Sequence, residues 1–230
     1  MATDLLLLAA FDPELAPLRL LLGDGLAARI GDRAVLARTC GVGLAASAAG
    51  AAAHIAELAP RAVVLVGSCG AYAGAPGAHL ALGDVVIAAR LRLVDLASVD
   101  GLAEFPSPMA TSLETDARLC EALAAFAAPG SPRAQVASCV ATTLAITVDD
   151  AAAARIAARA GADVEHLEAH GVAVACAGRR IPFTAVLGVA NFVGSRGRTE
   201  WLENHGRAEA AAGQRVVAWL RAKAAASERA

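Results

Sequence analysis

The sequence has few aromatic residues, no long block of like charge and no long apolar segment. Aromatic residues make up 3% of its 230 positions. The formal net charge is -2, which argues against a surface that coats nucleic acid. The apolar run at residues 5–10 is too short to span a bilayer and has no basic segment before it. We therefore expect neither a membrane anchor nor a signal peptide.

The cysteines show no pattern of disulfides or of a zinc site. There are five, an odd number, and they lie far apart with no C-x-x-C pair. This usage is typical of reduced thiols, so we expect a cytoplasmic protein. The sequence also lacks G-x-S-x-G, a P-loop and a complete G-x-G-x-x-G, which removes the commonest hydrolase and nucleotide-binding explanations.

Short apolar strands alternate with alanine-rich helices. Residues 5–10 are predicted to be a buried first strand, and the strands predicted over residues 33–39 and 62–66 flank an alanine-rich helix over residues 45–58. Such a βαβ unit indicates an α/β fold with parallel strands. No linker or repeat divides the chain, so we expect residues 1–230 to form one domain. Further helices are predicted over residues 12–22, 111–127, 149–160, 168–177 and 198–226, and further strands over 82–90, 135–140 and 183–189.

The segment G-S-C-G at residues 67–70 follows a predicted buried strand. Glycines at this point allow backbone N–H groups to approach a ligand closely, and Ser68 adds a hydroxyl. The alternative is a tight turn packed under a helix. The short motif by itself favours that alternative, because glycine motifs of this length match by chance.

Polar residues at predicted element boundaries are candidates for a site. Glu14 follows a helix-starting proline, and its carboxylate is as consistent with an interaction with the helix dipole as with catalysis. Glu168 is predicted in the first turn of a helix, whereas Glu165 is expected in solvent. Asn191 follows the last predicted strand. Ligands of open α/β sheets bind beyond the carboxyl ends of strands, so Glu168 and Asn191 are expected to face one cleft.

Two histidines and two arginines invite other interpretations. His166 and His170 are spaced i, i+4, but the zincin pattern needs a glutamate after the first histidine and no third ligand is evident. We therefore expect no metal. Arg196 and Arg198 either clamp an anion or line the entrance to the last helix. Trp201, at a predicted helix start, is more often a packing residue than a pocket cover.

Four segments together resemble the nucleoside phosphorylase/nucleosidase superfamily. They are A-F-D-P-E-L, G-S-C-G-A-Y before L-G-D-V-V, V-E-H-L-E-A-H-G, and V-A-N-F-V-G-S-R-G-R-T-E-W. The last is most similar to the futalosine hydrolase branch, nucleosidases of the alternative menaquinone pathway. The resemblance implies a three-layer α/β/α fold with a mixed central sheet, a purine nucleoside substrate and no cofactor. It also implies a homo-oligomer, a dimer or higher.

The resemblance implies a role for three polar residues. Glu14 would activate the attacking water, Glu168 would bind the ribose hydroxyls, and Asn191 would contact the purine. These roles are chemically coherent, because cleavage builds an oxocarbenium-like sugar and an anionic base. A carboxylate near the sugar stabilises the first, and a donor to the purine stabilises the second.

The resemblance also implies contacts around these residues. Ser68 and Gly70 would lie along the ribose and the base. Leu167 stands where the family usually has a methionine against the sugar. With so few aromatic residues, the candidates for stacking on the base are Phe105 and Phe192.

Two positions bear on the substrate and the reaction. The Asn191 amide can donate to N7 and O6 of a 6-oxopurine, whereas a protonated aspartate suits adenine, so Asn191 favours release of hypoxanthine from futalosine. Phosphorylases of the superfamily usually carry a phosphate-binding arginine where this chain has Leu15. Hydrolysis is therefore expected over phosphorolysis.

Alternative functions stay open at this level. G-S-C-G is closer to the purine nucleoside phosphorylase form, and a methylthioadenosine/S-adenosylhomocysteine nucleosidase is a further alternative. Leu187 and Ala190 replace an arginine and a serine that are usual in the family, and His170 is a further departure. These three residues motivate a second alternative, a catalytically weak nucleoside-binding relative.

Overall fold

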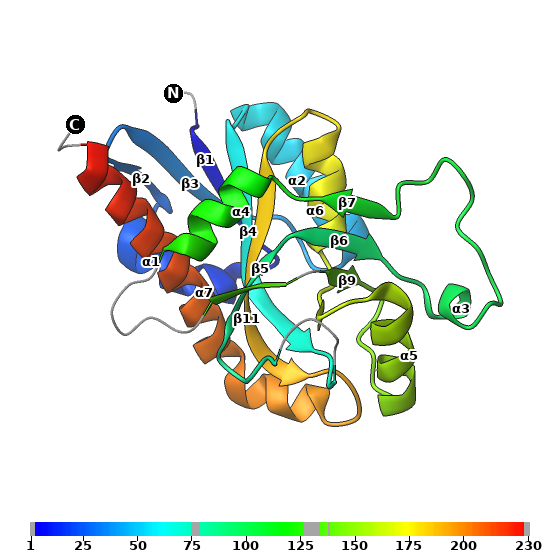
Figure 1. Cartoon of the computed structure of the whole chain (residues 1–230). Coiled ribbons are helices and arrows are strands. Elements are labelled where there is room, and N and C mark those ends of the chain that lie inside the picture. The colour runs from blue at the N-terminus through cyan, green and yellow to red at the C-terminus, as the bar shows by residue number, and fades with distance from the viewer. Residues whose placement is uncertain (1–2, 75–78, 127–133, 138, 228–230) are drawn as a thin grey trace.

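The computed structural model describes residues 3–74, 79–126, 134–137 and 139–227. Within these ranges eleven strands form one mixed sheet, and helices cover both of its faces (Figure 1). This confirms the expected three-layer α/β/α architecture with a mixed central sheet. In the same ranges, no helix is both long enough and apolar enough to cross a membrane.

The elements follow the predicted alternation of strands and helices. The strands are β1 (Leu5–Ala9), β2 (Ala27–Ile30), β3 (Arg33–Thr39), β4 (Ala62–Ala71), β5 (Val85–Ala88), β6 (Arg90–Leu93), β7 (Ser112–Glu114), β8 (Ala134–Ala137), β9 (Val140–Thr142), β10 (Val164–Glu165) and β11 (Phe183–Phe192). The helices are the 3-10 turn η1 (Asp12–Leu15), α1 (Ala16–Leu22), α2 (Leu44–Leu58), α3 (Leu96–Val99), α4 (Ala117–Ala125), α5 (Asp150–Ala160), α6 (Ala169–Ala177) and α7 (Gly197–Ser227).

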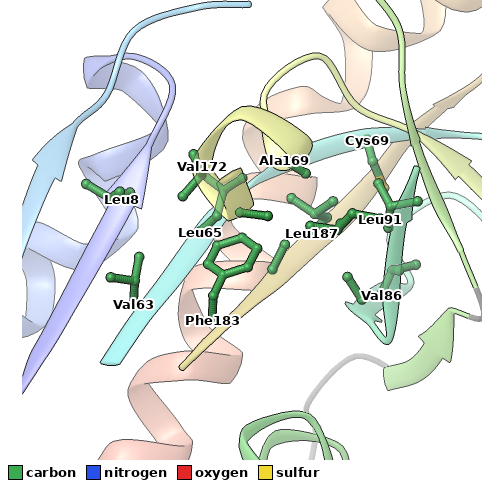
Figure 2. Packing of buried hydrophobic residues seen from close by; sticks show 14 of the residues in the cluster. Leu8, Val63, Leu65, Cys69, Val86, Leu91, Ala169, Val172, Phe183 and Leu187 are labelled. Atoms are coloured by element: carbon green, nitrogen blue, oxygen red, sulfur yellow. The ribbon is translucent and has the colours of Figure 1, made fainter. Parts of the chain in front are cut away.

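Alternate side chains of β1 enter two different cores. Leu6 and Leu8 pack on the side of α2 and α6, whereas Leu5 and Leu7 pack on the side of α1 and α7. Successive side chains of a strand point to opposite faces, so a strand covered on both faces is apolar throughout. Figure 2 shows the first of these cores, where Val172 of α6 lies over Leu65 of β4 and Phe183 of β11.

The long strand β4 changes neighbours along its length. On one side β1 pairs with its first half, from Ala62 to Leu65, and β10 pairs antiparallel with Gly70 and Ala71 at its end. On the other side β11 runs parallel to nearly the whole strand. The stretch of β4 around Ser68 therefore has no strand partner on the first side among the described strands. This interruption creates room for a site inside the sheet.

Several predicted boundaries are wrong, for local reasons. G-S-C-G is not a turn, because β4 continues through it to Ala71. Within the range predicted as a helix, residues 111–127, the first residues instead form the strand β7, which pairs with β6. The helix α4 begins after Asp116, whose side chain caps it by accepting from the N–H of Leu119. The strand predicted over 82–90 is divided into β5 and β6. The C-terminal end of the predicted helix, residue 127, lies outside the described residues.

Candidate functional site

A cavity of about 270 Å³ lies where β1, β4 and β11 run out toward their carboxyl ends. The segment after β1 contributes Ala10 and Glu14, and β4 contributes Ser68 and Gly70. Asn191 of β11 lies across β4 from the β1 segment. Glu14 and Asn191 therefore line one hollow, together with Glu168, which the sequence analysis expects to face the same cleft as Asn191.

Glu14 is held in a buried position by backbone donors. It is 3% exposed, and its Oε2 accepts from the N–H of Ala10 at 2.8 Å. Its Oε1 accepts from the N–H of Ser68 at 3.3 Å, on the side of β4 that lacks a strand partner. A Cβ on Gly67 would lie 2.6 Å from the same oxygen, so only glycine permits this approach.

Burial changes the acidity of Glu14. The pKa of its carboxyl is raised from the ordinary 4.5 to about 8. Desolvation by burial is the largest cause and nearby Glu209 and Glu168 also raise the pKa, while the hydrogen bonds from the Ala10 and Ser68 N–H groups lower it. A carboxyl with a pKa near 8 holds a proton more tightly than an exposed one. Once ionised, it is correspondingly a stronger base.

Glu168 and His166 face the cavity side by side. The Oε1 of Glu168 accepts from the N–H of Gly43 at 2.7 Å. The Nδ1 of His166 accepts from the N–H groups of Glu168 and Ala169 and lies 3.2 Å from Oε2 of Glu168. Because Nδ1 accepts two hydrogen bonds and burial lowers the pKa of this imidazole, the histidine is neutral and the contact is not an ion pair.

Glu165 does not lie in solvent as expected. It is 7% exposed at the end of β10 and lines the cavity. Its Oε2 accepts from the hydroxyls of Tyr72 at 2.8 Å and Thr147 at 2.6 Å, and its Oε1 accepts from the N–H of Thr147 at 3.0 Å. The short strand β10 buries this residue, and a two-residue strand leaves no periodic signal in a sequence.

A register shift in β11 positions Asn191. Val189 pairs with Cys69 and Asn191 pairs with Gly70, so Ala190 is an extra residue in the strand. Such bulges re-aim side chains. The amide Nδ2 donates to the carbonyl of Phe192 at 2.9 Å. A Cβ on Gly70 would lie 2.9 Å from that nitrogen, which explains the second glycine of G-S-C-G.

Trp201 forms a fixed wall of the cavity. Its indole N–H donates to Oγ of Ser68 at 3.2 Å. Its ring stacks on that of His205 with centroids 4.2 Å apart, and the guanidinium carbon of Arg198 lies 5.1 Å from the ring centroid. Arg198, Trp201 and His205 stand at i, i+3 and i+7 on the first turns of α7, so they share one face of the helix. The sequence reasoning favoured packing for a lone tryptophan, so it missed the position of Trp201 on the cavity wall.

The structure brings most of the predicted site residues to this cavity. Those that line it are Glu14, Ser68, Gly70, Leu167, Glu168 and Asn191. Phe105 lies instead along a separate hollow beside Asp95 and Arg159. Phe192 packs against the apolar core. The aromatic residues that line the cavity are Phe11 and Trp201.

Besides Trp201, four aromatic, charged or histidine residues of the cavity lining were not selected from the sequence. They are Phe11, Glu165, His166 and Arg198. Each lies within three residues of a predicted site residue or of Trp201, so their position next to the motifs was the one sequence feature that could have identified them. The two histidines do not share a helix, because His166 precedes α6. Among the described residues, no group of three or more His, Cys, Asp or Glu is arranged to hold a metal ion.

Comparisons with known proteins agree with this architecture. The sequence model of the Phosphorylase superfamily matches residues 22–222, a range that begins after Glu14. A sequence search of curated proteins finds no match.

Solved structures of two kinds of nucleosidase share the fold. A 5'-methylthioadenosine/S-adenosylhomocysteine nucleosidase from Neisseria meningitidis, in complex with methylthio-immucillin-A, is 21% identical with a TM-score of 0.80 and covers 96% of this chain and 99% of that chain. The futalosine hydrolase of Helicobacter pylori is 16% identical with a TM-score of 0.82, over 95% and 97%. The S-adenosylhomocysteine nucleosidase of Streptococcus pyogenes is 21% identical with a TM-score of 0.81, over 96% and 97%. At these identities the similarity shows a shared fold and does not distinguish between substrates.

Proposed function

The chain belongs to the phosphorylase superfamily, and on this premise we propose that it hydrolyses the N-glycosidic bond of futalosine and releases hypoxanthine. The observation that carries the proposal is the placement of Glu14 and Asn191 in one cavity, on either side of β4. The reaction would belong to the alternative menaquinone pathway.

Glu14 supplies the base for the attacking water. As the bond between the ribose and N9 breaks, its electron pair moves to the purine and the sugar becomes oxocarbenium-like. Water adds to the anomeric carbon and gives a proton to the carboxylate of Glu14. The two N–H groups that hold this carboxyl keep it oriented in the cavity.

Asn191 supports the departure of a 6-oxopurine. One of the two Nδ2 hydrogens is used by the carbonyl of Phe192. The second is available to N7 or O6 of hypoxanthine, both of which are acceptors. A donor at this position stabilises the negative charge that develops on the base.

Glu168 is suited to bind the ribose. Its Oε2 accepts no hydrogen bond from the residues that the structure describes, and it faces the unprotonated Nδ1 of His166. Two acceptors that face each other favour a bound donor, such as a ribose hydroxyl. Leu167, which is half-buried in the same wall, supplies an apolar contact for the sugar.

The charges of the cavity favour water over phosphate as the attacking group. Leu15, at the usual arginine position of the phosphorylases, is 2% exposed and packs into the core. Three glutamates line the cavity, and Arg198 is the one arginine or lysine among the described lining residues. A free phosphate dianion would meet more carboxyl groups than cations.

A second candidate is adenine release from methylthioadenosine, since nucleosidases of that name share the fold equally well. Asn191 argues against it, for the reason given above. Leu187 and Ala190, which replace an arginine and a serine that are usual in the family, are both fully buried, and Leu187 packs in the apolar core.

A nucleoside panel tests the proposal. Futalosine, inosine and methylthioadenosine are incubated with the protein, with and without phosphate, and free base is separated by chromatography. We expect hypoxanthine from futalosine without phosphate. A requirement for phosphate would indicate a phosphorylase, and preferential release of adenine would indicate the other nucleosidase. Ligand binding with no turnover of any nucleoside would indicate a binding protein.

A further inference from the structure

The charged groups that line the cavity differ in whether they already have partners. Glu14 and Glu165 each accept two or more hydrogen bonds, and Glu168 accepts one from Gly43. His166 is neutral, as argued above. Arg198 is therefore the one positive charge on the lining formed by the described residues.

Arg198 has no acidic partner within the described ranges, unlike its neighbour in sequence. Arg196 donates to Oε1 of Glu200 at 2.6 Å and lies outside the cavity lining. The guanidinium of Arg198 instead lies over the ring of Trp201, which is anchored by Ser68 and His205. This contact orders the guanidinium at the cavity wall and leaves its N–H donors available.

The residues around Arg198 indicate which kind of ligand group it can bind. Arg198 is exposed, whereas Glu14 and Glu168 are buried, so the arginine lies at the mouth of the cavity. Val42 and Ile146, which are 59% and 50% exposed, also line the cavity. A substituent that extends from the sugar to the mouth meets apolar side chains and one cation.

We propose that Arg198 is a specificity-determining residue that binds an anionic group carried by the substrate on an apolar sugar substituent. The site thereby favours nucleosides with such a substituent over neutral nucleosides of the same size. Arginine suits this task because its planar N–H donors match a carboxylate. The inference rests on the proposed function, since it takes the ligand to be a nucleoside with its base at Asn191.

The test removes the charge of Arg198 and compares a matched pair of nucleosides. Futalosine, whose sugar substituent ends in a carboxylate, is compared with its methyl ester, which has the same skeleton without the charge. For Arg198→Gln we expect KM for futalosine to rise about ten- to a hundredfold, with less than about threefold change for the ester. Arg198→Lys should recover part of the loss, because it keeps the charge.

Arg207→Gln is the control variant. Arg207 is exposed on the same helix, donates to Oδ1 of Asn204 and does not line the cavity. Its loss changes the net charge of the protein by the same amount, so it reports any long-range electrostatic effect. We expect the parent ratio between futalosine and its ester.

Two results would overturn the inference. Equal losses for futalosine and its ester would show that Arg198 contacts a part common to both, or only supports Trp201. A change confined to the dependence on added phosphate would show that its anion is free phosphate. The same ligand pair is also measured by calorimetry. Binding then decides the role of Arg198 even if no nucleoside is cleaved, an outcome that would refute the proposed function separately.

Discussion

At the scale of single residues, backbone N–H groups organise the cavity more than other side chains do. Glu14 accepts from Ala10 and Ser68, and Glu168 accepts from Gly43. Backbone donors cannot rotate away, so each carboxyl is held in one orientation. Removing a carboxyl therefore tests its chemistry with little change in the surrounding geometry.

Glu14→Gln should lower kcat by about 10²- to 10⁴-fold, because an amide cannot take the proton of water. The Gln oxygen can still accept from the N–H of Ala10, so we expect the Kd for nucleoside to stay within about threefold of the parent value. Steady-state release of hypoxanthine and calorimetry measure the two quantities. Glu203→Gln, an exposed position on α7, serves as the control. Cleavage at the parent rate would show that Glu14 only supports the fold.

Glu14 should also make stability depend on pH. Its pKa in the folded protein, about 8, is above the ordinary value of 4.5, so the folded state binds this proton more tightly than the unfolded state. The contribution of the protonated carboxyl to stability is present below about pH 4.5 and is lost as the pH rises through about 8.

We therefore expect Glu14→Gln, which mimics the protonated form, to be more stable than the parent at about pH 9 by roughly 3–5 kcal/mol. At about pH 5 the two should differ little, because Glu14 is protonated in the folded parent. Urea unfolding at both values measures the difference. A constant gap between the two proteins would mean that the pKa of Glu14 is not raised.

Asn191→Asp should change which base is released. A protonated aspartate donates to N7 and accepts from the 6-amino group of adenine, whereas the asparagine NH2 suits the 6-oxo group. We expect the kcat/KM ratio of hypoxanthine to adenine release to fall by roughly tenfold or more. Parallel assays with a 6-oxo and a 6-amino nucleoside that share one substituent measure it. An unchanged ratio would mean that this amide does not read the base.

At the scale of elements, the contact between β11 and α7 positions the cavity wall. Asn191 lies in β11, and Arg198 and Trp201 lie on α7. The two elements pack closely because Gly188 has no side chain, and a Cβ there would lie 2.0 Å from the carbonyl oxygen of Ala208. The carbonyl oxygen of Ala208 belongs to the helix backbone, so it cannot move aside for a Cβ unless the strand or the helix shifts.

Gly188→Ala should consequently destabilise the protein by about 3 kcal/mol and reduce activity, since α7 must move away from the strand. Thermal unfolding and base release measure the two effects. Gly206→Ala is the matched control on α7, where a Cβ would meet nothing within 4 Å. In a helix interior this change should stabilise the fold by up to about 1 kcal/mol. The prediction fails if both variants unfold at the same temperature.

At the scale of the whole molecule, exposed apolar side chains gather around the cavity mouth. Val42 and Ile146 line it, and the same segment as Ile146 carries Leu144 and Val148, which are 69% and 66% exposed. Apolar residues grouped in this way mark an interaction surface. The homo-oligomer that the family resemblance implies stays a prediction, and we expect its interface at this surface. That residues 1–230 form one domain stays a prediction.

Leu144→Asp should weaken self-association by about a hundredfold or more, because a carboxylate would be buried at the interface. Light scattering coupled to gel filtration measures the mass, and we expect at least a dimer for the parent. Leu20→Asp is the control: Leu20 is 89% exposed on α1, away from this segment. A monomeric parent, or equal effects of the two changes, would refute the interface.

The core of the fold was predictable from local patterns. The strand over residues 33–39 and the helix near residues 45–58 were located to within one residue, because apolar runs and the limits set by Gly43 and Pro60 are local signals. The site was predicted less completely. Glu165 and Trp201 were assigned to solvent and packing, since their partners Tyr72 and Ser68 are distant in sequence.

The sequence by itself determined the alternation of strands and helices, the superfamily resemblance and the pairing of Glu14 with Asn191 as candidates. These depend on periodicity and on residue identity, which are properties of short segments. Only the tertiary structure decided that β4 lacks a strand partner beside Ser68, that Glu165 is buried, and that Arg198 is without an acidic partner in the described parts of the chain. Burial and hydrogen bonding depend on which distant segments meet, and a linear pattern does not contain that information.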